Sequence, residues 1–83
     1  MIENRTLREY FFDPSAWHRT DRPNRICRRW FTAGVEVELR YASGRWTWRV
    51  RNLDTNETTK NVGDCGSMRG AMESAFREIG GET

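Results

Sequence analysis

Arginine is the residue whose number and spacing in this chain most suggest a binding chemistry. The 83 residues include thirteen arginines and one lysine, Lys60. The guanidinium group is a planar fork that fits phosphate and carboxylate groups and stacks on aromatic rings. The bias therefore suggests an interaction surface, with a coding preference for arginine over lysine as the alternative explanation.

Five arginines fall in one short segment that contains a single acid, Asp21. They are Arg19, Arg22, Arg25, Arg28 and Arg29. His18 adjoins them, and Trp17 and Trp30 flank the segment. Arginine interleaved with tryptophan is typical of surfaces that bind phosphates or acidic proteins. We expect these arginines to contact a partner, with Trp17 as an exposed anchor. The alternative is a peripheral loop with ordinary surface arginines.

A second arginine group alternates with apolar residues farther along the chain. Its members are Arg45, Arg49 and Arg51, which share their predicted face with Arg40 and Thr47. In a strand, residues at every second position share one face, so these side chains would form a patch able to grip a phosphate backbone. If the strand pairs so that Glu38 and Glu36 lie opposite two of them, ion pairs would cancel most of the local positive potential.

Catalytic and metal chemistry have little support in the sequence. Cys27 with His18 is the sole nucleophile–base candidate, and no third group to orient the base accompanies it. Nucleophile-elbow and phosphate-loop motifs are missing, and one histidine is few for zinc, which takes about four ligands. We expect no enzymatic activity, no cofactor and no metal. Cys27 and Cys65 are expected to be reduced, with one disulfide as the alternative.

The composition is that of a folded, water-soluble domain. Hydrophobic residues make up 36% of the chain and charged residues 31%, and the formal net charge is +2. No apolar run approaches the roughly 20 residues that cross a bilayer, and the N-terminus lacks a signal-peptide pattern. We therefore expect a cytoplasmic protein without membrane contact. Charge is unevenly spread, because residues 52–83 carry six acids against three basic residues.

The elements that must position these arginines begin with a hairpin at residues 35–51. Apolar residues occupy every second position on both sides of Ser43-Gly44, which predicts two strands joined by a two-residue turn. The implied register sets Tyr41 opposite Trp46, Leu39 opposite Trp48 and Val37 opposite Val50. It also sets Glu38 opposite Arg49 and Glu36 opposite Arg51. Both tryptophans then belong to the core face.

Further elements flank this hairpin. Residues 6–9 match a capping box for a helix over 7–12, and Asp13-Pro14 predicts a second short helical start. Residues 25–31 and 58–62 are predicted strands. Ser67 is a fair N-cap for a helix over 67–79, whose apolar stripe falls at helical spacing. That stripe consists of Met68, Ala71, Met72, Ala75, Phe76 and Ile79. Gly70 weakens its first turn.

Together these elements predict an α+β fold in one domain, residues 1–83. A three- to four-stranded antiparallel sheet would pack on one C-terminal helix, behind a short helical N-terminal segment. The N-terminal segment covers residues 1–24, the sheet residues 25–62 and the helix residues 67–79. The sequence leaves monomer and homodimer open, since an edge strand could pair between copies.

Residues 35–79 resemble the AP2-type DNA-binding domain, which has three antiparallel strands and a helix. The strand motif G-[KR]-[WF]-x-x-x-[IV]-R-[DN] reads here as Gly44-Arg45-Trp46-Thr47-Trp48-Arg49-Val50-Arg51-Asn52. The resemblance implies that Arg45, Arg49 and Arg51 contact a DNA groove. The chain departs from the family at Glu36 and Glu38, where basic residues are usual, and at Cys65, where an aromatic residue is usual.

Two further resemblances concern general type. The helix–strands–helix order is similar to that of double-stranded-RNA-binding domains, although Met68 and Arg69 stand where those domains have lysines. A small α+β chain with a basic and an acidic end also resembles phage-encoded inhibitors of the anti-CRISPR type. This implies a non-catalytic protein that docks on a protein or nucleoprotein complex and blocks or modulates it. A direct DNA- or RNA-binding module is the alternative expectation.

Overall fold

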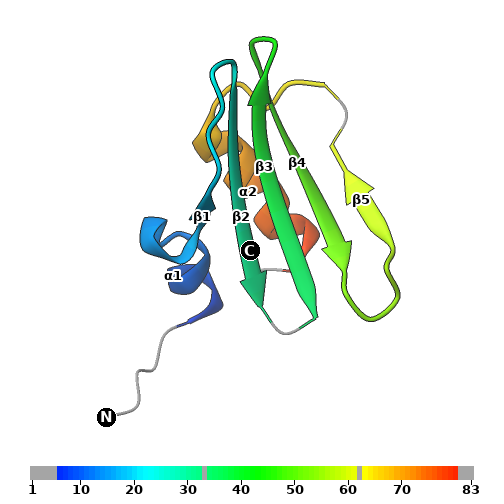
Figure 1. Ribbon diagram of the computed structural model, residues 1–83. Helices are drawn as coiled ribbons and strands as arrows, with labels where there is room; N and C mark the ends of the chain where they lie inside the picture. Colours follow the sequence, from blue (N-terminus) through cyan, green and yellow to red (C-terminus); the bar gives the residue numbers. More distant parts are fainter. Residues whose placement is uncertain (1–5, 33, 62, 81–83) are drawn as a thin grey trace.

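The chain folds into one antiparallel sheet with helical segments on a single face (Figure 1). The computed structural model describes residues 6–32, 34–61 and 63–80. The sheet contains five strands, which are β1 (His18–Arg19), β2 (Arg25–Thr32), β3 (Val35–Ala42), β4 (Arg45–Asn52) and β5 (Thr58–Lys60). The helical segments are α1 (Leu7–Phe11), the 3₁₀ turn η1 (Pro14–Ala16) and α2 (Met68–Glu78). The predicted α+β class is confirmed.

The central hairpin has the register that its sequence predicts. Ala42 pairs with Arg45 across the Ser43-Gly44 turn, and Leu39 pairs with Trp48. Ser43 and Gly44 both adopt positive φ, at 55° and 75°, as a type I′ turn requires. Because side chains alternate along each strand, this register sends the apolar residues to one face and the charged residues to the other.

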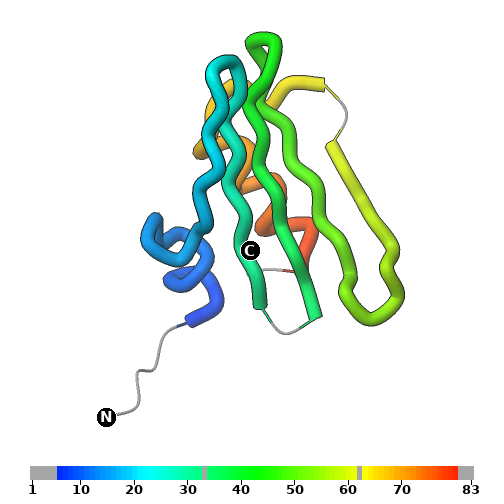
Figure 2. Tube along the Cα trace, in the orientation of Figure 1, coloured from blue at the N-terminus to red at the C-terminus, as the bar shows by residue number. Residues whose placement is uncertain are grey.

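The sheet is a meander, since its strand order in space follows the chain order from β1 to β5 (Figure 2). The predicted strands at 25–31 and 58–62 are present as β2 and β5, and position 62 lies outside the described residues. The unexpected strand is β1, which brings the total to five. It pairs with β2 through His18 and Arg19, and an isolated bridge between Arg22 and Arg25 closes the connecting turn.

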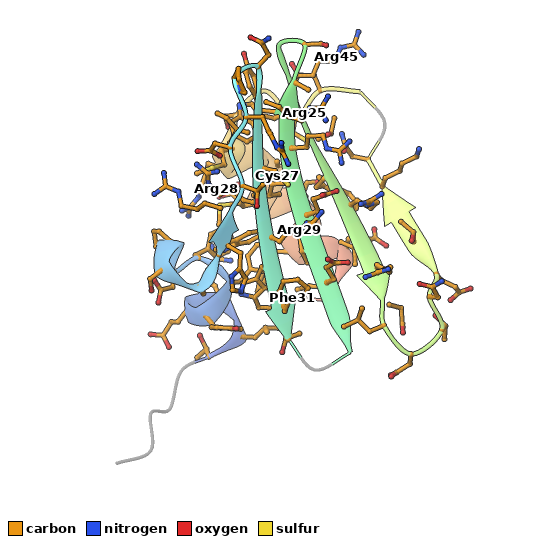
Figure 3. All side chains as sticks on the ribbon, viewed as in Figure 1. Arg25, Cys27, Arg28, Arg29, Phe31 and Arg45 are labelled. Carbon is orange, nitrogen blue, oxygen red and sulfur yellow. The ribbon has the colours of Figure 1, made fainter. Side chains whose placement is uncertain are left out.

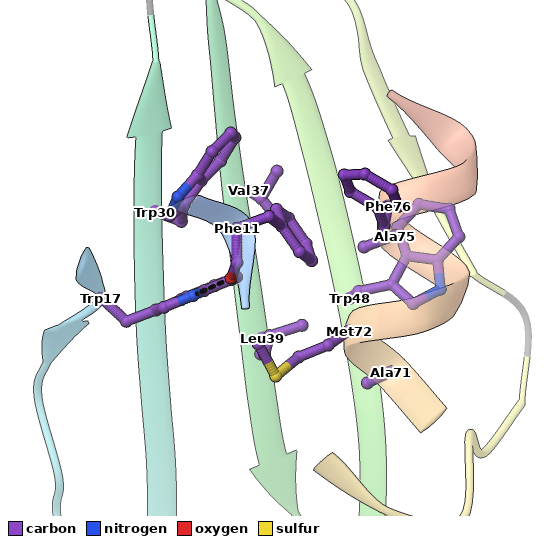
Figure 4. Close-up of a cluster of buried hydrophobic side chains, with 10 residues drawn as sticks. All are labelled: Phe11, Trp17, Trp30, Val37, Leu39, Trp48, Ala71, Met72, Ala75 and Phe76. Atoms are coloured by element: carbon purple, nitrogen blue, oxygen red, sulfur yellow. Dashed lines mark hydrogen bonds between the residues drawn. The ribbon is translucent and has the colours of Figure 1, made fainter. Parts of the chain in front are cut away.

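Helix α2 covers the apolar face of the sheet. Ser67 caps it by accepting a hydrogen bond from the Gly70 N–H at 2.9 Å. Ala71, Met72, Ala75 and Phe76 are buried, as the helical spacing predicts. Met68 differs, because at 41% exposure it lies at the margin of the interface rather than inside it. Figure 4 shows the helix side chains facing Val37, Leu39 and Trp48 of the sheet.

The N-terminal segment completes the core on the same face. The capping box of α1 is present, with Thr6 and Glu9 bonded reciprocally at 2.9 and 3.0 Å. Asp13 caps η1 as expected. Phe11 is fully buried, and its ring lies 4.9 Å from that of Trp30 and 5.0 Å from that of Phe76. The segment therefore joins the edge of the sheet to α2.

The opposite face of the sheet is bare of helices, and Figure 1 looks directly onto it. We call it the open face. Within the described ranges, neither helix has the length and apolar character needed to span a membrane.

Candidate functional site

The open face carries charged residues from four strands, because strand alternation sends every second side chain there. The registers of β2 to β5 bring seven cations to this face against two acids. The cations are Arg25, Arg29, Arg40, Arg45, Arg49, Arg51 and Lys60, and the acids are Glu36 and Glu38. Figure 3 shows Arg25, Arg29 and Arg45 along β2 and at the β3–β4 turn. The face therefore has a formal charge excess of five.

Glu38 is the centre of this arrangement. It is only 4% exposed, and its carboxylate forms ion pairs with guanidinium groups on three strands. Arg49 Nη2 lies 2.8 Å from Oε1, Arg40 Nη2 lies 3.4 Å from Oε1, and Arg29 Nη2 lies 3.3 Å from Oε2. The three arginine side chains remain 45–49% exposed. One buried carboxylate thus orients three guanidinium forks whose remaining N–H groups reach solvent.

The charges around Glu38 determine its protonation. Burial alone would raise the pKa of Glu38, but Arg49, Arg40, the Cys27 thiol and Arg29 together hold it below its ordinary value. The same contact raises the pKa of Arg29, chiefly through the charge of Glu38. At neutral pH the cluster is therefore fully ionised, with two positive charges in excess.

A second ion pair lies farther along the same two strands. Glu36 Oε1 and Arg51 Nη2 are 2.8 Å apart, so both predicted cross-strand pairs, Glu36–Arg51 and Glu38–Arg49, are present. The expected consequence, a nearly neutral face, is wrong. The reason is that the hairpin itself carries two arginines, Arg40 and Arg45, beyond these two pairs. Strands β2 and β5 then add Arg25, Arg29 and Lys60 without adding an acid.

A shallow hollow lies on the part of the open face formed by β3, β4 and β5. It has a volume of about 310 Å³ and is bordered by Arg40, Arg49 and Lys60, with Glu38 and Thr47 also in its lining. Three cations around one concave spot match the geometry in which arginine and lysine hold a phosphate group. Phe31, 38% exposed, lies on β2 at the other end of the face, with the His18 ring 5.6 Å away.

Cys27 also lies on the open face, and its thiol donates a hydrogen bond to Glu38 Oε2 at 3.5 Å. Burial and the neighbouring Glu38 raise the pKa of the Cys27 thiol. A raised pKa disfavours the thiolate that nucleophilic catalysis needs. Cys27 and Cys65 are both free, in agreement with the expected reduced state. Across the described part of the chain, no group of acidic, cysteine and histidine residues could hold a metal ion.

The five arginines of residues 19–29 do not form one patch. Strand alternation places Arg25 and Arg29 on the open face, whereas Arg28 points to the helical side. There it forms an ion pair with Asp21 and is 15% exposed. Arg19 pairs with Arg28 in the β1–β2 register and shares its side of the sheet, and Arg22 lies at the turn between these strands. The sheet thus divides the first arginine group: Arg25 and Arg29 join Arg45, Arg49 and Arg51 on the open face, and the other members lie elsewhere.

Trp17 was expected to be an exposed anchor, and this prediction is wrong. It is 7% exposed, and its indole N–H donates a hydrogen bond to the Phe11 carbonyl at 2.7 Å (Figure 4). The sequence alone predicts Arg40 on this face but does not predict Lys60 there. The signal that could have found Lys60 is strand parity, since it pairs with Arg49.

Comparison with known proteins adds no relative: no protein-family model, curated protein or solved structure matches the chain significantly. The geometry of the open face is therefore the basis for assigning a function.

Proposed function

We propose that this chain is a non-catalytic binding protein that docks through its open face on the phosphate backbone of a nucleic acid, free or within a nucleoprotein complex. The observation that carries the proposal is the excess of seven cations over two acids on one bare sheet face. The proposal includes the cytoplasmic location expected from the sequence.

Charge density supports a polyanionic partner. The whole chain has a formal net charge of only +2, whereas the open face alone carries an excess of five. The remainder of the molecule is therefore acidic on balance. This uneven distribution of charge orients the molecule as it approaches a negative surface, because the open face is attracted and the rest of the molecule is repelled. Duplex nucleic acid offers a dense and regular array of negative charges to this face.

The fixed positions of the guanidinium groups support the same partner. Glu38 restrains Arg29, Arg40 and Arg49 before any partner binds, so less side-chain freedom is lost on docking. Six of the seven cations are arginines, which bind phosphate bidentately. Arg45, Arg49 and Arg51, the positions implied by the AP2 resemblance, all belong to this face.

The test is fluorescence anisotropy with labelled duplex DNA, duplex RNA and single strands at about 50 and 200 mM salt. We expect a duplex to bind with a Kd in the micromolar range or tighter at the lower salt. With about four phosphates neutralised, affinity should fall roughly a hundredfold at the higher salt. Failure of every nucleic acid to bind at the lower salt would overturn the proposal.

Matched double variants locate the contact. Arg25→Gln/Arg45→Gln removes two open-face charges that take part in no ion pair among the described residues. Arg8→Gln/Arg77→Gln removes two exposed charges from the helical side. Both variants have the same net charge, so bulk electrostatics affects them equally. We expect the first to weaken duplex binding and flatten its salt dependence, and the second to behave like wild type. Equal losses would contradict docking through the open face.

A second candidate is an inhibitor that docks on an acidic protein surface, the anti-CRISPR-like expectation. The observation that favours it is Phe31, 38% exposed beside His18 on a face of arginines. An aromatic anchor surrounded by arginine is typical of protein interfaces. Against an identified protein partner, Phe31→Ala should weaken binding by about tenfold or more. Under the first proposal the same variant leaves duplex affinity nearly unchanged, which separates the two candidates.

A further inference from the structure

A second concave site lies on the helical side of the sheet, remote from the open face. It is a cavity of about 350 Å³ between α2, the N-terminal segment and the sheet edge. Its apolar lining consists of Phe12, Pro14, Trp17, Leu39, Met68 and Met72. Three arginines complete it, namely Arg19, Arg28 and Arg69. No acidic residue lines it, and its volume is in the range of small-molecule sites.

The cavity has a rigid apolar base. Trp17, Leu39 and Met72 are between 1% and 8% exposed, and in Figure 4 the Met72 sulfur lies against Leu39. Trp17 is fixed by its hydrogen bond to the Phe11 carbonyl. An apolar body inserted here would meet side chains that are already held in place, so little ordering accompanies binding.

The charges at the cavity leave one positive charge in excess. Arg28 forms an ion pair with Asp21, and Arg69 Nε lies 3.1 Å from Glu73 Oε2. Arg19 takes part in no ion pair within the described residues. Three guanidinium groups are thus paired with two carboxylates. One negative charge on a ligand would neutralise the remaining positive charge.

Free N–H groups remain on these arginines. Arg28 uses Nη1 for its bonds to Asp21 and to the Cys27 carbonyl, and Arg69 uses Nε for Glu73. The Arg69 guanidinium also lies 4.6 Å from the centre of the Phe12 ring, which holds its plane against an apolar wall. The terminal nitrogens left over can donate to an acidic group, because arginine offers five N–H donors in total.

We propose that this cavity is a binding site for a small organic monoanion with an aromatic body and one carboxylate or sulfonate group. The body would fill the space between Trp17, Leu39 and Met72, and the acid would meet the arginines at the rim. The site is separate from the proposed nucleic-acid surface, since Arg19 of β1 and Arg28 of β2 point to the helical side, Arg69 belongs to α2, and none of the three lies on the open face. Binding would also tie the N-terminal segment to α2.

The test uses two fluorescent probes that differ in charge. 1-Anilinonaphthalene-8-sulfonate has an aromatic body and one negative charge, whereas N-phenyl-1-naphthylamine has the same body without the sulfonate. We expect the anionic probe to bind the folded chain in one-to-one stoichiometry. The neutral probe should bind roughly tenfold or more weakly, because it makes no charge-assisted hydrogen bond. Equal affinity of the two probes, or no binding of the anionic one, would overturn the proposal.

Three variants assign the site. Met68→Trp fills the cavity from a residue already 41% exposed, so it blocks the space without removing a charge. Arg19→Gln removes the unpaired charge without leaving an acid unmatched. Both should weaken the anionic probe, and Arg19→Gln should leave the neutral probe unchanged. Arg25→Gln/Arg45→Gln on the open face is the control and should have no effect. Thermal unfolding of each variant shows whether it remains folded.

The opposite results contradict the site. If Met68→Trp and Arg19→Gln remain folded and bind the anionic probe like wild type, the cavity is not where it binds. If the open-face control loses the probe instead, the sulfonate is attracted by the arginines of that face, and the proposal is overturned.

Discussion

The carboxylate of Glu38 lies 2.8 Å from the guanidinium of Arg49 across the β3–β4 pair, with Glu38 buried and Arg49 half exposed. The ion pair thus connects a buried carboxylate with a guanidinium group that reaches solvent on the open face. A buried carboxylate is costly unless its oxygens are hydrogen-bonded, and here Arg29, Arg40 and the Cys27 thiol are the hydrogen-bond donors. Under the proposed function, the stability of the fold and the binding of a partner would therefore depend on the same residue.

Glu38→Gln should destabilise the fold. The substitution removes the charge that three arginines surround, and it leaves their mutual repulsion uncompensated. Because the arginines are half exposed, solvent screens the loss, and we expect a decrease of about 1–2 kcal/mol in the free energy of unfolding. Urea unfolding at neutral pH measures it. Glu36→Gln is the matched control, since Glu36 pairs with Arg51 alone and should cost less. A larger loss for the control would contradict the central role of Glu38.

Acid should weaken the fold through the same residue. The pKa of Glu38 is held below its ordinary value of 4.5, so the folded chain takes up this proton less readily than the unfolded chain. The stabilisation is then complete above about pH 4.5 and is lost as pH falls through the lower, folded-state pKa. Arg28, as hydrogen-bond donor to Asp21, shifts the pKa of that acid in the same direction.

Unfolding free energies measured between about pH 6 and pH 2.5 check this dependence. Glu38→Gln should have a flatter profile than wild type below pH 4.5, because it lacks the group that titrates. A variant profile as steep as that of wild type would assign the acid sensitivity to other carboxylates.

Cys27 should react slowly with a neutral alkylating reagent. Burial and Glu38 raise the pKa of its thiol above the ordinary 9.0, so little thiolate is present at neutral pH. Iodoacetamide labelling in a Cys65→Ala background, followed by mass spectrometry, reports this residue alone. Glu38→Gln removes one cause of the raised pKa and should speed the labelling. Labelling of the folded protein as fast as that of the unfolded chain would contradict the thiol environment described.

Gly70→Ala should destabilise α2, although alanine is the better helix former by about 1 kcal/mol. A Cβ at this position would lie 2.6 Å from the Cys65 carbonyl oxygen, well inside contact distance. The loop before the helix would have to move. We expect a lower melting temperature, measured by circular dichroism. Glu73→Ala, on the exposed side of the same helix, should change it little. A raised melting temperature for Gly70→Ala would contradict this expectation, because it would mean that the loop before α2 can move away from the new Cβ at little cost.

Gly70 also illustrates what the sequence can and cannot reveal. From propensity alone it is a weak point in the first turn of a helix, whereas in the fold it is required by a carbonyl five residues earlier. The hairpin register was predictable because period-two alternation and the Ser43-Gly44 turn are local signals. The caps at Thr6, Asp13 and Ser67 were predictable for the same reason.

The site was predictable only in part, because it depends on neighbours distant in the sequence. Strand β1 has two residues and no alternation of its own, and it exists through pairing with β2. The charge of the open face depends on Arg29 lying beside Glu38, a pairing of β2 with β3. Trp17 is close to arginines in the sequence, but its ring packs in the core, where its centre lies 5.2 Å from the centre of the Phe11 ring.

The order of the strands has a consequence for how fast the fold forms. In a meander each strand pairs with the strand next to it in the chain, so most contacts close short loops. Closing a short loop costs less chain entropy than closing a long one, which favours early pairing of neighbouring strands. The contacts of α2 with the sheet and with the N-terminal segment are long-range, and that of Phe11 with Phe76 joins segments near the two ends of the chain. Stopped-flow refolding should show this closure as the slow event, and Phe11→Leu should accelerate unfolding more than it retards folding.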